Sequence, residues 1–500
     1  MKLKKDEIED NPYLRIGVYP FINCCGSRTI HSGPPMLPEV KQAMEVASNY
    51  SVNIDELMEC VGRRLGELTG AEWGIVTSGA SAALCHATAA CVAGTDPEKM
   101  LRLPKTEGLK NRVITLKGGR YTYDHAIRMA DVQILELETR DEILKNLDER
   151  VVMVALLGNH LARAEGSLGL QDIVELTQPL GVPILIDAAA EFLTLPNAYL
   201  NRGATMVAYS GGKYLRGPQP TGLLLGKKEW VQAAWINSAP HHAFGRAMKV
   251  GKEEIMGVLA AVEYWVTKRN PDVEYRRWEA DLSIIAREAT KVPHVVAETR
   301  PSETPTAAVP RLEIRWEGDR IGLTGLELRD QLLKGYPRIM LDDRGATDTS
   351  VFILPFSLQP GEAEVVGMRI REVLANAPKG RIETPMPPVR VEGSWDLKVQ
   401  YALGSATHCL LLEQQGHKLA GSHRTLYHEN RLSGKIQGTQ ITFASLHRFE
   451  GTNLSYKFIG TVNGDIMEGI VELGSTGQSA PGPLNQKEYG LGQWKAMRKK

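Results

Sequence analysis

A chain of 500 residues is too long for one hydrophobic core, so two or three domains are expected. Hydrophobic residues make up 43% of the sequence and charged residues 24%, as in an ordinary globular protein. Lys plus Arg and Asp plus Glu both total 59, and this zero formal charge argues against a nucleic acid or an anionic membrane as partner.

The compartment can be predicted from the first residues and from the cysteines. The first ten residues are charged, which predicts no secretory signal, and no run approaches the ~20 apolar residues of a membrane-spanning helix. Six cysteines without a Cys-x-x-Cys pair predict reduced thiols, with neither a disulfide framework nor a metal site. We therefore expect a cytoplasmic protein.

A phosphate-binding turn is predicted near residue 78. A short apolar strand ends at Thr77, and Ser78-Gly79-Ala80 leads into an Ala-rich helix that stops at Gly94. The start of such a helix offers free backbone N–H groups, hydroxyls and the positive end of the helix dipole, which together suit a phosphate. An ordinary capped helix has the same pattern, so the motif needs support from other parts of the chain.

Two further apolar strands, 112–116 and 151–157, are followed by polar or aromatic side chains. These candidates are Tyr121, Tyr123, His125, Asn159 and His160. The three rings could lie against a planar cofactor or could simply pack, and the carboxyl end of a parallel strand is where ligands bind in open sheets.

A carboxylate and a lysine end the next two strands. The apolar run 182–186 stops at Asp187, which could cap a turn or face a ligand. Another run stops at Ser210, and two glycines then precede Lys213 on a tight turn before the apolar run 223–225. A lysine held away from water there could act as a nucleophile, although a lysine in a Gly-rich turn is more often solvated.

These groups form a set that suits one cofactor. Strands alternate with helices from about 74 to 226, which predicts a parallel sheet covered on both faces, so the strand ends converge on one crevice. Pyridoxal phosphate needs an amine for its Schiff base, a carboxylate beside its ring nitrogen, and N–H and hydroxyl groups around its phosphate. Lys213, Asp187 and the turn at Ser78 supply them.

The rest of the chain predicts further domains. Basic residues at Arg246, Lys249 and Lys252 could receive an anionic substrate or a phosphate, although such charges are more often solvated. Seven short alternating strands near the C-terminus predict an antiparallel barrel or sandwich. The expected organisation is an N-terminal arm (1–50), a large domain with a parallel sheet (51–270), a small α+β domain (271–382), a Pro-rich linker (383–391), a β domain (392–475) and a tail (476–500).

The motifs quoted above resemble a known family. Asp187-Ala-Ala-Ala, Ser210-Gly-Gly-Lys with Gly217-Pro-Gln behind it, and Thr77-Ser-Gly-Ala are similar to fold-type I (aspartate aminotransferase-like) pyridoxal phosphate enzymes of the SelA-like group. Within that group the chain most resembles the D-glucosaminate-6-phosphate ammonia-lyase branch, over about residues 12–380. Further matching segments are Tyr19-Pro-Phe-Ile-Asn, Val52-Asn-Ile-Asp-Glu-Leu, Tyr123-Asp-His-Ala-Ile-Arg and Met248-Lys-Val-Gly-Lys-Glu-Glu-Ile.

The resemblance implies roles for individual residues. It implies Lys213 as the Schiff-base lysine and Asp187 as the partner of the ring nitrogen. It also implies phosphate contacts at Ser78, Gly79, Ala80 and Ser210. Tyr123, His125 and Asn159, which follow strands, are the other expected cofactor contacts. The substrate candidates are Arg28, His160, Arg246, Lys249 and Lys252, with Arg344 for a carboxylate. The resemblance also implies a homodimer or larger assembly with active sites between subunits.

The leading hypothesis is a lyase acting on an amino acid or an amino sugar acid. Lys213 would take the proton from Cα, loss of a hydroxyl from the adjacent carbon would follow, and ammonia and a 2-keto acid would be released. Racemisation, aldol cleavage and transamination begin with the same activation of the substrate and stay open. Selenium transfer is disfavoured by the balanced charge, and a non-catalytic binding protein built around the β domain is the remaining alternative.

Overall fold

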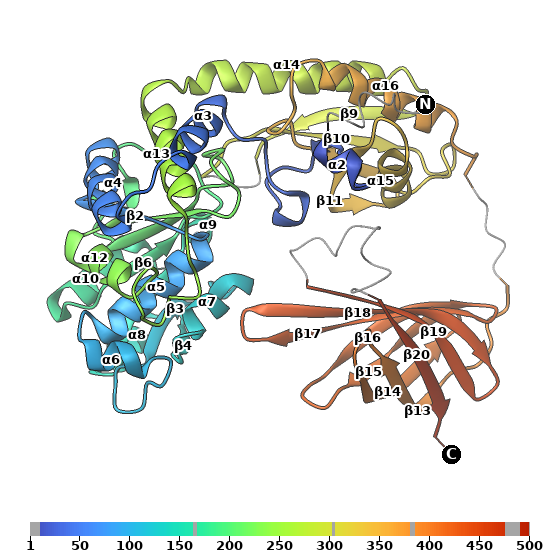
Figure 1. Cartoon of the computed structure of the whole chain (residues 1–500). Helices are drawn as coiled ribbons and strands as arrows, with labels where there is room; N and C mark the ends of the chain where they lie inside the picture. The colour runs from blue at the N-terminus through green and yellow to red at the C-terminus, as the bar shows by residue number, and fades with distance from the viewer. Residues whose placement is uncertain (1–10, 164–167, 303–305, 381–385, 476–490, 500) are drawn as a thin grey trace. The chain divides into compact units, whose positions relative to one another are not determined.

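The computed structural model describes residues 11–163, 168–302, 306–380, 386–475 and 491–499 (Figure 1). The chain divides into two compact units. The first comprises the residues up to 315 together with 335–342 and 352–372, and the second comprises 316–334, 343–351 and the residues from 373 onward. Except for the C-terminal tail, the domain boundaries drawn from the sequence stay predictions.

A seven-stranded sheet forms the centre of the first unit, in the order β2-β8-β7-β6-β5-β3-β4. Its strands are β2 (Trp73–Thr77), β3 (Arg112–Leu116), β4 (Gln133–Leu137), β5 (Val151–Leu157), β6 (Ile184–Asp187), β7 (Met206–Ser210) and β8 (Gly222–Gly226). The strands from β7 to β4 pair in parallel. Because both faces of these strands are covered, β5 is apolar and buried over most of its length.

One strand corrects the expectation of an all-parallel sheet. β8 runs antiparallel to both of its neighbours, β7 and β2. The connection from β7 to β8 spans only residues 211–221, and a parallel crossover requires a dozen or more residues, usually with a helix. The turn that carries Lys213 therefore reverses the chain direction.

Helices cover this sheet. α5 (Ala80–Ala93) is built from small apolar residues on all sides, is almost wholly buried, and packs against β2, β5, β6, β7 and β8. α4 (Ile54–Thr69) and α13 (Lys252–Thr267) pack on β2. Further helices in the described residues up to 289 are α2 (Pro12–Arg15), α3 (Pro38–Ser48), α6 (Pro97–Arg102), α7 (His125–Arg128), α8 (Arg140–Asn146), α9 (Gly158–Arg163), α10 (Leu170–Thr177), α11 (Ala198–Asn201), α12 (Lys228–Ile236) and α14 (Pro271–Ala289), with the 3-10 turns η1 (Thr29–His31), η2 (Thr122–Asp124) and η3 (Gln178–Leu180).

A second sheet has five strands in the order β1-β11-β12-β10-β9. They are β1 (Ile22–Cys24), β9 (Val295–Arg300), β10 (Arg311–Trp316), β11 (Ile339–Thr347) and β12 (Ser350–Ile353), accompanied by α15 (Gly325–Lys334) and α16 (Glu362–Ala375). The N-terminal segment contributes β1, whose Ile22 pairs in parallel with Ile339 of β11. The predicted arm thus supplies an edge strand.

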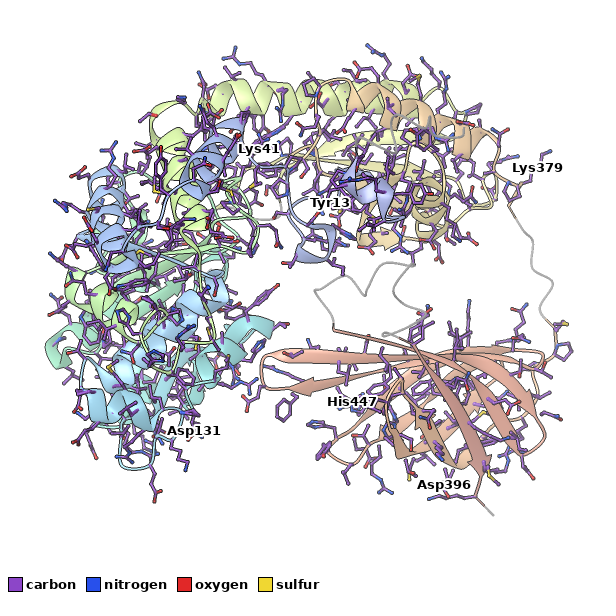
Figure 2. The ribbon with its side chains drawn as sticks, in the orientation of Figure 1. Tyr13, Lys41, Asp131, Lys379, Asp396 and His447 are labelled. Carbon is purple, nitrogen blue, oxygen red and sulfur yellow. The ribbon has the colours of Figure 1, made fainter. Side chains whose placement is uncertain are left out.

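The C-terminal part folds as a closed eight-stranded antiparallel barrel. Its strands are β13 (Gly393–Gln400), β14 (Ser405–Gln415), β15 (Lys418–Arg424), β16 (Glu429–Gln437), β17 (Gln440–Phe449), β18 (Thr452–Asn463), β19 (Ile466–Ser475) and β20 (Leu491–Arg498). Along β13, Trp395, Leu397 and Val399 point inward and are buried, whereas Asp396 lies on the outside (Figure 2). This alternation is the pattern of a strand with one buried face.

The predicted tail at 476–500 is wrong for residues 491–498. β20 pairs with both β13 and β19 and thereby closes the barrel. Trp494 and Ala496 are buried between exposed neighbours, so an alternating strand pattern is present in the sequence there. Residues 476–490 lie outside the described part of the chain.

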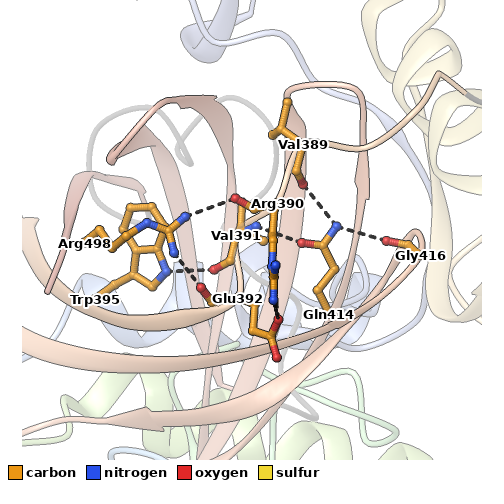
Figure 3. A network of polar contacts seen from close by, with 8 residues as sticks. All are labelled: Val389, Arg390, Val391, Glu392, Trp395, Gln414, Gly416 and Arg498. Atoms are coloured by element: carbon orange, nitrogen blue, oxygen red, sulfur yellow. Dashed lines mark hydrogen bonds and ion pairs between the residues drawn. The ribbon is translucent and has the colours of Figure 1, made fainter. Parts of the chain in front are cut away.

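Polar contacts join residues 389–392, which precede β13, to strands of the barrel (Figure 3). Nε1 of Trp395 donates to the carbonyl oxygen of Val391 at 2.9 Å, and the side chain of Gln414 accepts from the Val391 N–H at 2.8 Å. Arg498 of β20 donates to the carbonyl oxygen of Arg390 at 3.0 Å, and its guanidinium lies 4.3 Å from the centroid of the Trp395 ring. These contacts fix the segment before β13 to the last strand.

Three buried histidines form a hydrogen-bonded chain inside the barrel. His423 contacts His408 at 2.9 Å through Nε2 and His447 at 3.1 Å through Nδ1. The hydroxyl of Ser445 lies 2.7 Å from Nδ1 of His423. Both nitrogens of His423 have partners, and the Ser445 hydroxyl also lies 3.2 Å from Nε2 of His447, so the network satisfies polar groups within an otherwise aromatic core.

Candidate active site

The sheet register brings the predicted site residues to one edge. Asp187 pairs with Leu157 of β5 on one side and with Ala208 of β7 on the other. Further along β7, Ser210 pairs with Gly222, which pairs with Thr77 of β2. The carboxylate, the serine and the turn after Thr77 therefore follow neighbouring strands at the same end of the sheet.

The turn at Ser78 leaves space in front of α5. Gly79 has φ +103°, which favours glycine, and a Cβ built on it would have nothing within 4 Å. Gly222 packs directly behind this turn, since a Cβ on Gly222 would lie 2.5 Å from the backbone nitrogen of Ala80. The open helix N-terminus is thus supported by the strand that leaves the Lys213 turn.

Glycines make the Lys213 turn compact. The N–H of Gly211 donates to Thr221 at 2.9 Å and that of Gly217 to Gly211 at 2.8 Å, so the two ends of the turn are joined. A Cβ on Gly212 would lie 2.4 Å from the Cα of Gln219. Only glycine fits there, and Lys213 itself is half-buried on a fixed backbone.

Two donors hold the carboxylate of Asp187, which is only 6% exposed. The N–H of Ala189 donates to Oδ1 at 2.9 Å, and the hydroxyl of Tyr121 donates to Oδ2. Burial, and then the charge of Asp187, raise the pKa of Tyr121 well above its usual value, so the phenol remains a donor. Asp187 and Tyr121 line the same pocket, together with Thr115, Gly119, Arg120 and Leu156.

The other predicted cofactor contacts are more scattered. Tyr123 is 40% exposed, and His125 is exposed with Nδ1 2.8 Å from the carbonyl oxygen of Thr122. Asn159 accepts a hydrogen bond from Thr306, and the ring of His160 lies against Gly118 and Gly119. Of the three rings considered from the sequence, Tyr121 is the one hydrogen-bonded to Asp187.

The predicted substrate residues lie in several places. Arg28 forms a buried ion pair with Asp342, and Lys252 pairs with Glu253. Arg246 and Lys249 are exposed in the segment before α13. Arg344 is exposed on β11, in the second unit.

Sequence reasoning missed Glu191, a carboxylate four residues after Asp187. It is buried, and its Oε2 accepts a hydrogen bond of 2.7 Å from the hydroxyl of Tyr199. Burial, and to a lesser degree the charge of Asp187, raise the pKa of Glu191 to about 7. A single carboxylate inside the apolar run from Ala188 to Leu193 was the available signal.

The arrangement fits pyridoxal phosphate. A buried, donor-held carboxylate, an open helix N-terminus and a lysine on a rigid turn occupy one sheet edge, and the space at Gly79 admits a bulky anion.

Among the described residues, no group of three or more His, Cys, Asp and Glu side chains is arranged to hold a metal ion. Within the same residues, no helix combines the length and apolar character needed to cross a bilayer.

Known proteins were compared with the chain in sequence and in structure. No model of a protein family matches it. A relative named D-glucosaminate-6-phosphate ammonia lyase, from Salmonella typhimurium, is 30% identical over 377 residues, covering 73% of this chain and 99% of the relative. A solved structure of a D-glucosaminate-6-phosphate ammonia-lyase matches with a TM-score of 0.66 and 29% identity, covering 73% of this chain and 99% of that one.

More distant relatives have other names. A 5'-C-glycyluridine monooxygenase-decarboxylase from Streptomyces sp. is 27% identical over 383 residues, covering 74% of this chain and 94% of the relative. An L-seryl-tRNA(Sec) selenium transferase from Moorella thermoacetica is 26% identical over 227 residues, covering 42% of this chain and 44% of the relative. The resemblance stated from the motifs and the predicted fold class, with an appended antiparallel β domain, are confirmed. The chain belongs to the D-glucosaminate-6-phosphate ammonia-lyase family of SelA-like, fold-type I pyridoxal phosphate enzymes.

Proposed function

We propose that this chain is a pyridoxal phosphate-dependent ammonia-lyase that acts on an amino acid or an amino sugar acid and releases ammonia and a 2-keto acid. The observation that carries the proposal is the register that aligns Asp187, Ser210 and the turn after Thr77 at one sheet edge. The name of the relative that is 30% identical supports the reaction class.

The cofactor would be held by groups at that edge. Asp187 would face the ring nitrogen, and Lys213 would supply the amine for the covalent link. The backbone of Gly79 and Ala80, with the hydroxyls of Ser78 and Ser210, would hold the phosphate. Asn159, Tyr123 and His125 are proposed as outer contacts, the last two being exposed in the single chain.

Different residues of the chain would transfer protons and orient the cofactor. When bound, pyridoxal phosphate supplies an electron sink for the electron pair left on the substrate's Cα. The amine of Lys213 would take the Cα proton and, as an ammonium group, return a proton to the departing hydroxyl. Tyr121 and Ala189 keep the Asp187 carboxylate in a fixed orientation, so this acceptor does not reorganise during the reaction.

The substrate and the assembly are also proposed. Arg246 and Lys249 are exposed and available to an anionic substrate, and Lys252 lines a cleft with Tyr50 and Met256. Tyr50 is 64% exposed at that cleft, and such apolar exposure favours burial in a homodimer or larger assembly. Roles for Arg28, His160 and Arg344 in substrate binding, and a cytoplasmic location, belong to the same proposal.

The test is a substrate screen with the full chain loaded with pyridoxal phosphate. Ammonia and keto-acid release would be measured with D-glucosaminate 6-phosphate, other amino sugar acids, and D- and L-amino acids. Release that disappears in Lys213→Ala is the expected result. Deuterium exchange at Cα in D₂O, without ammonia or keto acid, would overturn the lyase proposal in favour of a racemase or a related enzyme.

A further inference from the structure

Glu191 is a buried acid with one free oxygen. Its side chain is 6% exposed, its Oε2 accepts from Tyr199, and its Oε1 is buried without a hydrogen-bond partner among the described residues. Its backbone N–H donates to the carbonyl oxygen of Ala188 at 3.0 Å, which ties it closely to the end of β6. An unpaired carboxyl oxygen is costly to bury, so its place in the fold needs a reason.

The free oxygen lies over the end of β5. A Cβ built on Gly158 would be 2.1 Å from Oε1 of Glu191 and 2.5 Å from the hydroxyl of Tyr199. The carboxyl therefore fills the space that a side chain at 158 would take. Gly158 is the residue immediately before Asn159, so Glu191 sets the path of the backbone into α9.

A second contact joins the same segment to Asn159. The N–H of Phe192 donates to the carbonyl oxygen of Thr306 at 3.0 Å. The hydroxyl of Thr306 in turn donates to Oδ1 of Asn159. The residues that follow Asp187 thus fix both the backbone before Asn159 and the donor that orients its amide.

We infer that Glu191 is a positioning residue, which holds the end of β5 and, through its neighbour Phe192 and then Thr306, the amide of Asn159 in place. This inference rests on the proposed function, because Asn159 matters only if the cofactor binds at this edge. Glu191 touches neither cofactor nor substrate in this assignment. Its effect is transmitted directly to Gly158 and, through Phe192, to Thr306.

The charge state of Glu191 gives the inference a distinctive readout. Among the described residues, the titratable groups that act on Glu191 are Asp187 on β6, Tyr199 on α11 and Tyr209 on β7, all of them acidic or phenolic. Burial raises its pKa to about 7, while the hydrogen bond from Tyr199 acts in the opposite direction. As pH rises through 7 the carboxyl becomes charged beside Asp187, and this repulsion should loosen the end of β5.

The experiment compares the wild type with Glu191→Gln and Glu191→Ala in the full chain. Cofactor affinity is measured by titrating pyridoxal phosphate between pH 6 and 9, with the borohydride-sensitive visible absorbance as a second signal. Glutamine keeps the size of the acid without its charge, so Glu191→Gln should match the wild type at pH 6 and lose the rise in Kd above pH 7. Glu191→Ala should raise Kd about tenfold throughout, since Tyr199 loses its acceptor.

Two further variants separate positioning from general damage. Gly158→Ala alone should weaken cofactor binding, because the added methyl group clashes with the Glu191 carboxyl. In the double variant with Glu191→Ala that carboxyl is absent, so the increase in Kd should be smaller than the product of the two single increases. Glu175→Gln, on the exposed side of α10, is the matched control and should change nothing.

The outcomes distinguish this inference from the proposed function. A wild-type chain that gains no borohydride-sensitive absorbance would contradict the proposed function itself. The role of Glu191 would be overturned if the wild type binds the cofactor, Glu191→Gln shows the same dependence of Kd on pH as the wild type, and Glu191→Ala has the same Kd as the wild type. If Glu191→Ala fails to fold, the pH curves of wild type and Glu191→Gln still decide.

Discussion

The hydroxyl of Tyr121 donates to Oδ2 of Asp187, joining two residues 66 positions apart in the sequence. Tyr121 follows β3 and Asp187 ends β6, and β5 lies between these strands in the sheet. The contact therefore crosses a neighbouring strand at the sheet edge. It gives the carboxylate a fixed acceptor geometry that a water molecule could not guarantee.

Removing this donor should lower turnover more than cofactor binding. Tyr121→Phe keeps the ring and deletes the hydroxyl, so we expect kcat to fall about tenfold, the effect of one hydrogen bond to a charged group. Asp187→Asn should lower kcat by more than about a hundredfold, because the amide cannot stabilise a protonated ring nitrogen. Both variants should keep the melting temperature of the wild type within a few degrees, and steady-state kinetics with the screened substrate would check them. Unchanged kcat in Asp187→Asn would remove this carboxylate from the chemistry.

Gly222→Ala should damage the phosphate-binding turn from behind. The added methyl group would lie 2.4 Å from the carbonyl carbon of Gly79, so either β8 or the start of α5 must move. Overpacking of this kind costs about 1–3 kcal/mol, which predicts a lower melting temperature and a weaker Kd for pyridoxal phosphate. Gly169→Ala is the control, because a Cβ there meets only Asp172 at an ordinary 3.7 Å. Equal behaviour of the two variants would mean that β8 does not support the turn.

The histidine chain should make the barrel sensitive to acid. Burial, and then its histidine neighbours, lower the pKa of His423 to about 3, whereas an unfolded histidine titrates near 6.5. The unfolded state therefore binds more protons between these values, so stability is full above about pH 6.5 and is lost as pH falls, by up to ~1.4 kcal/mol per pH unit for each such histidine. Hydrogen exchange of β14, β15 and β17 at pH 5 and 7.5 would measure it. His423→Gln should make the stability of the barrel less dependent on pH, whereas His242→Gln, at an exposed site, should leave that dependence unchanged.

Arg498 should stabilise the barrel through the segment before β13. Its guanidinium donates to the backbone at Arg390 and stacks on Trp395, so Arg498→Ala should cost about 2 kcal/mol of unfolding free energy, measured by urea denaturation of the full chain. Lys499→Ala is the matched control, since the Lys499 side chain pairs with the exposed Asp396 and lies near the half-buried Cys409, and its loss should have no measurable effect. A smaller loss for Arg498 than for Lys499 would contradict this account.

The candidate site was predictable because its signals are local. Asp187, Lys213 and the turn at Ser78 each follow an apolar strand with glycines or hydroxyls at short spacing, and parallel strands bring such ends together. Tyr121 was only one of three candidate rings, because its contact with Asp187 depends on the strand order. Glu191 was missed for a similar reason, since its partners Tyr199 and Gly158 are set by packing.

Two errors in the fold have physical causes. The antiparallel direction of β8 follows from the length of the connection after Ser210, a constraint that the apolar pattern of 223–225 does not contain. β20 was taken for a tail because it is separated from β19 by a long stretch without alternation, and its role depends on closure with β13. Short strands with distant partners are the hardest to predict from periodicity alone.

The pairing of β13 with β20 also sets an order of events during synthesis. The sheet that carries Asp187 and Lys213 is complete once residue 226 has been made, whereas the barrel keeps two unpaired strand edges until residues 491–498 emerge. Exposed edges invite association with other chains. On a crowded polysome the nascent barrel, and not the part that holds the seven-stranded sheet, is therefore where protection by a chaperone would matter most.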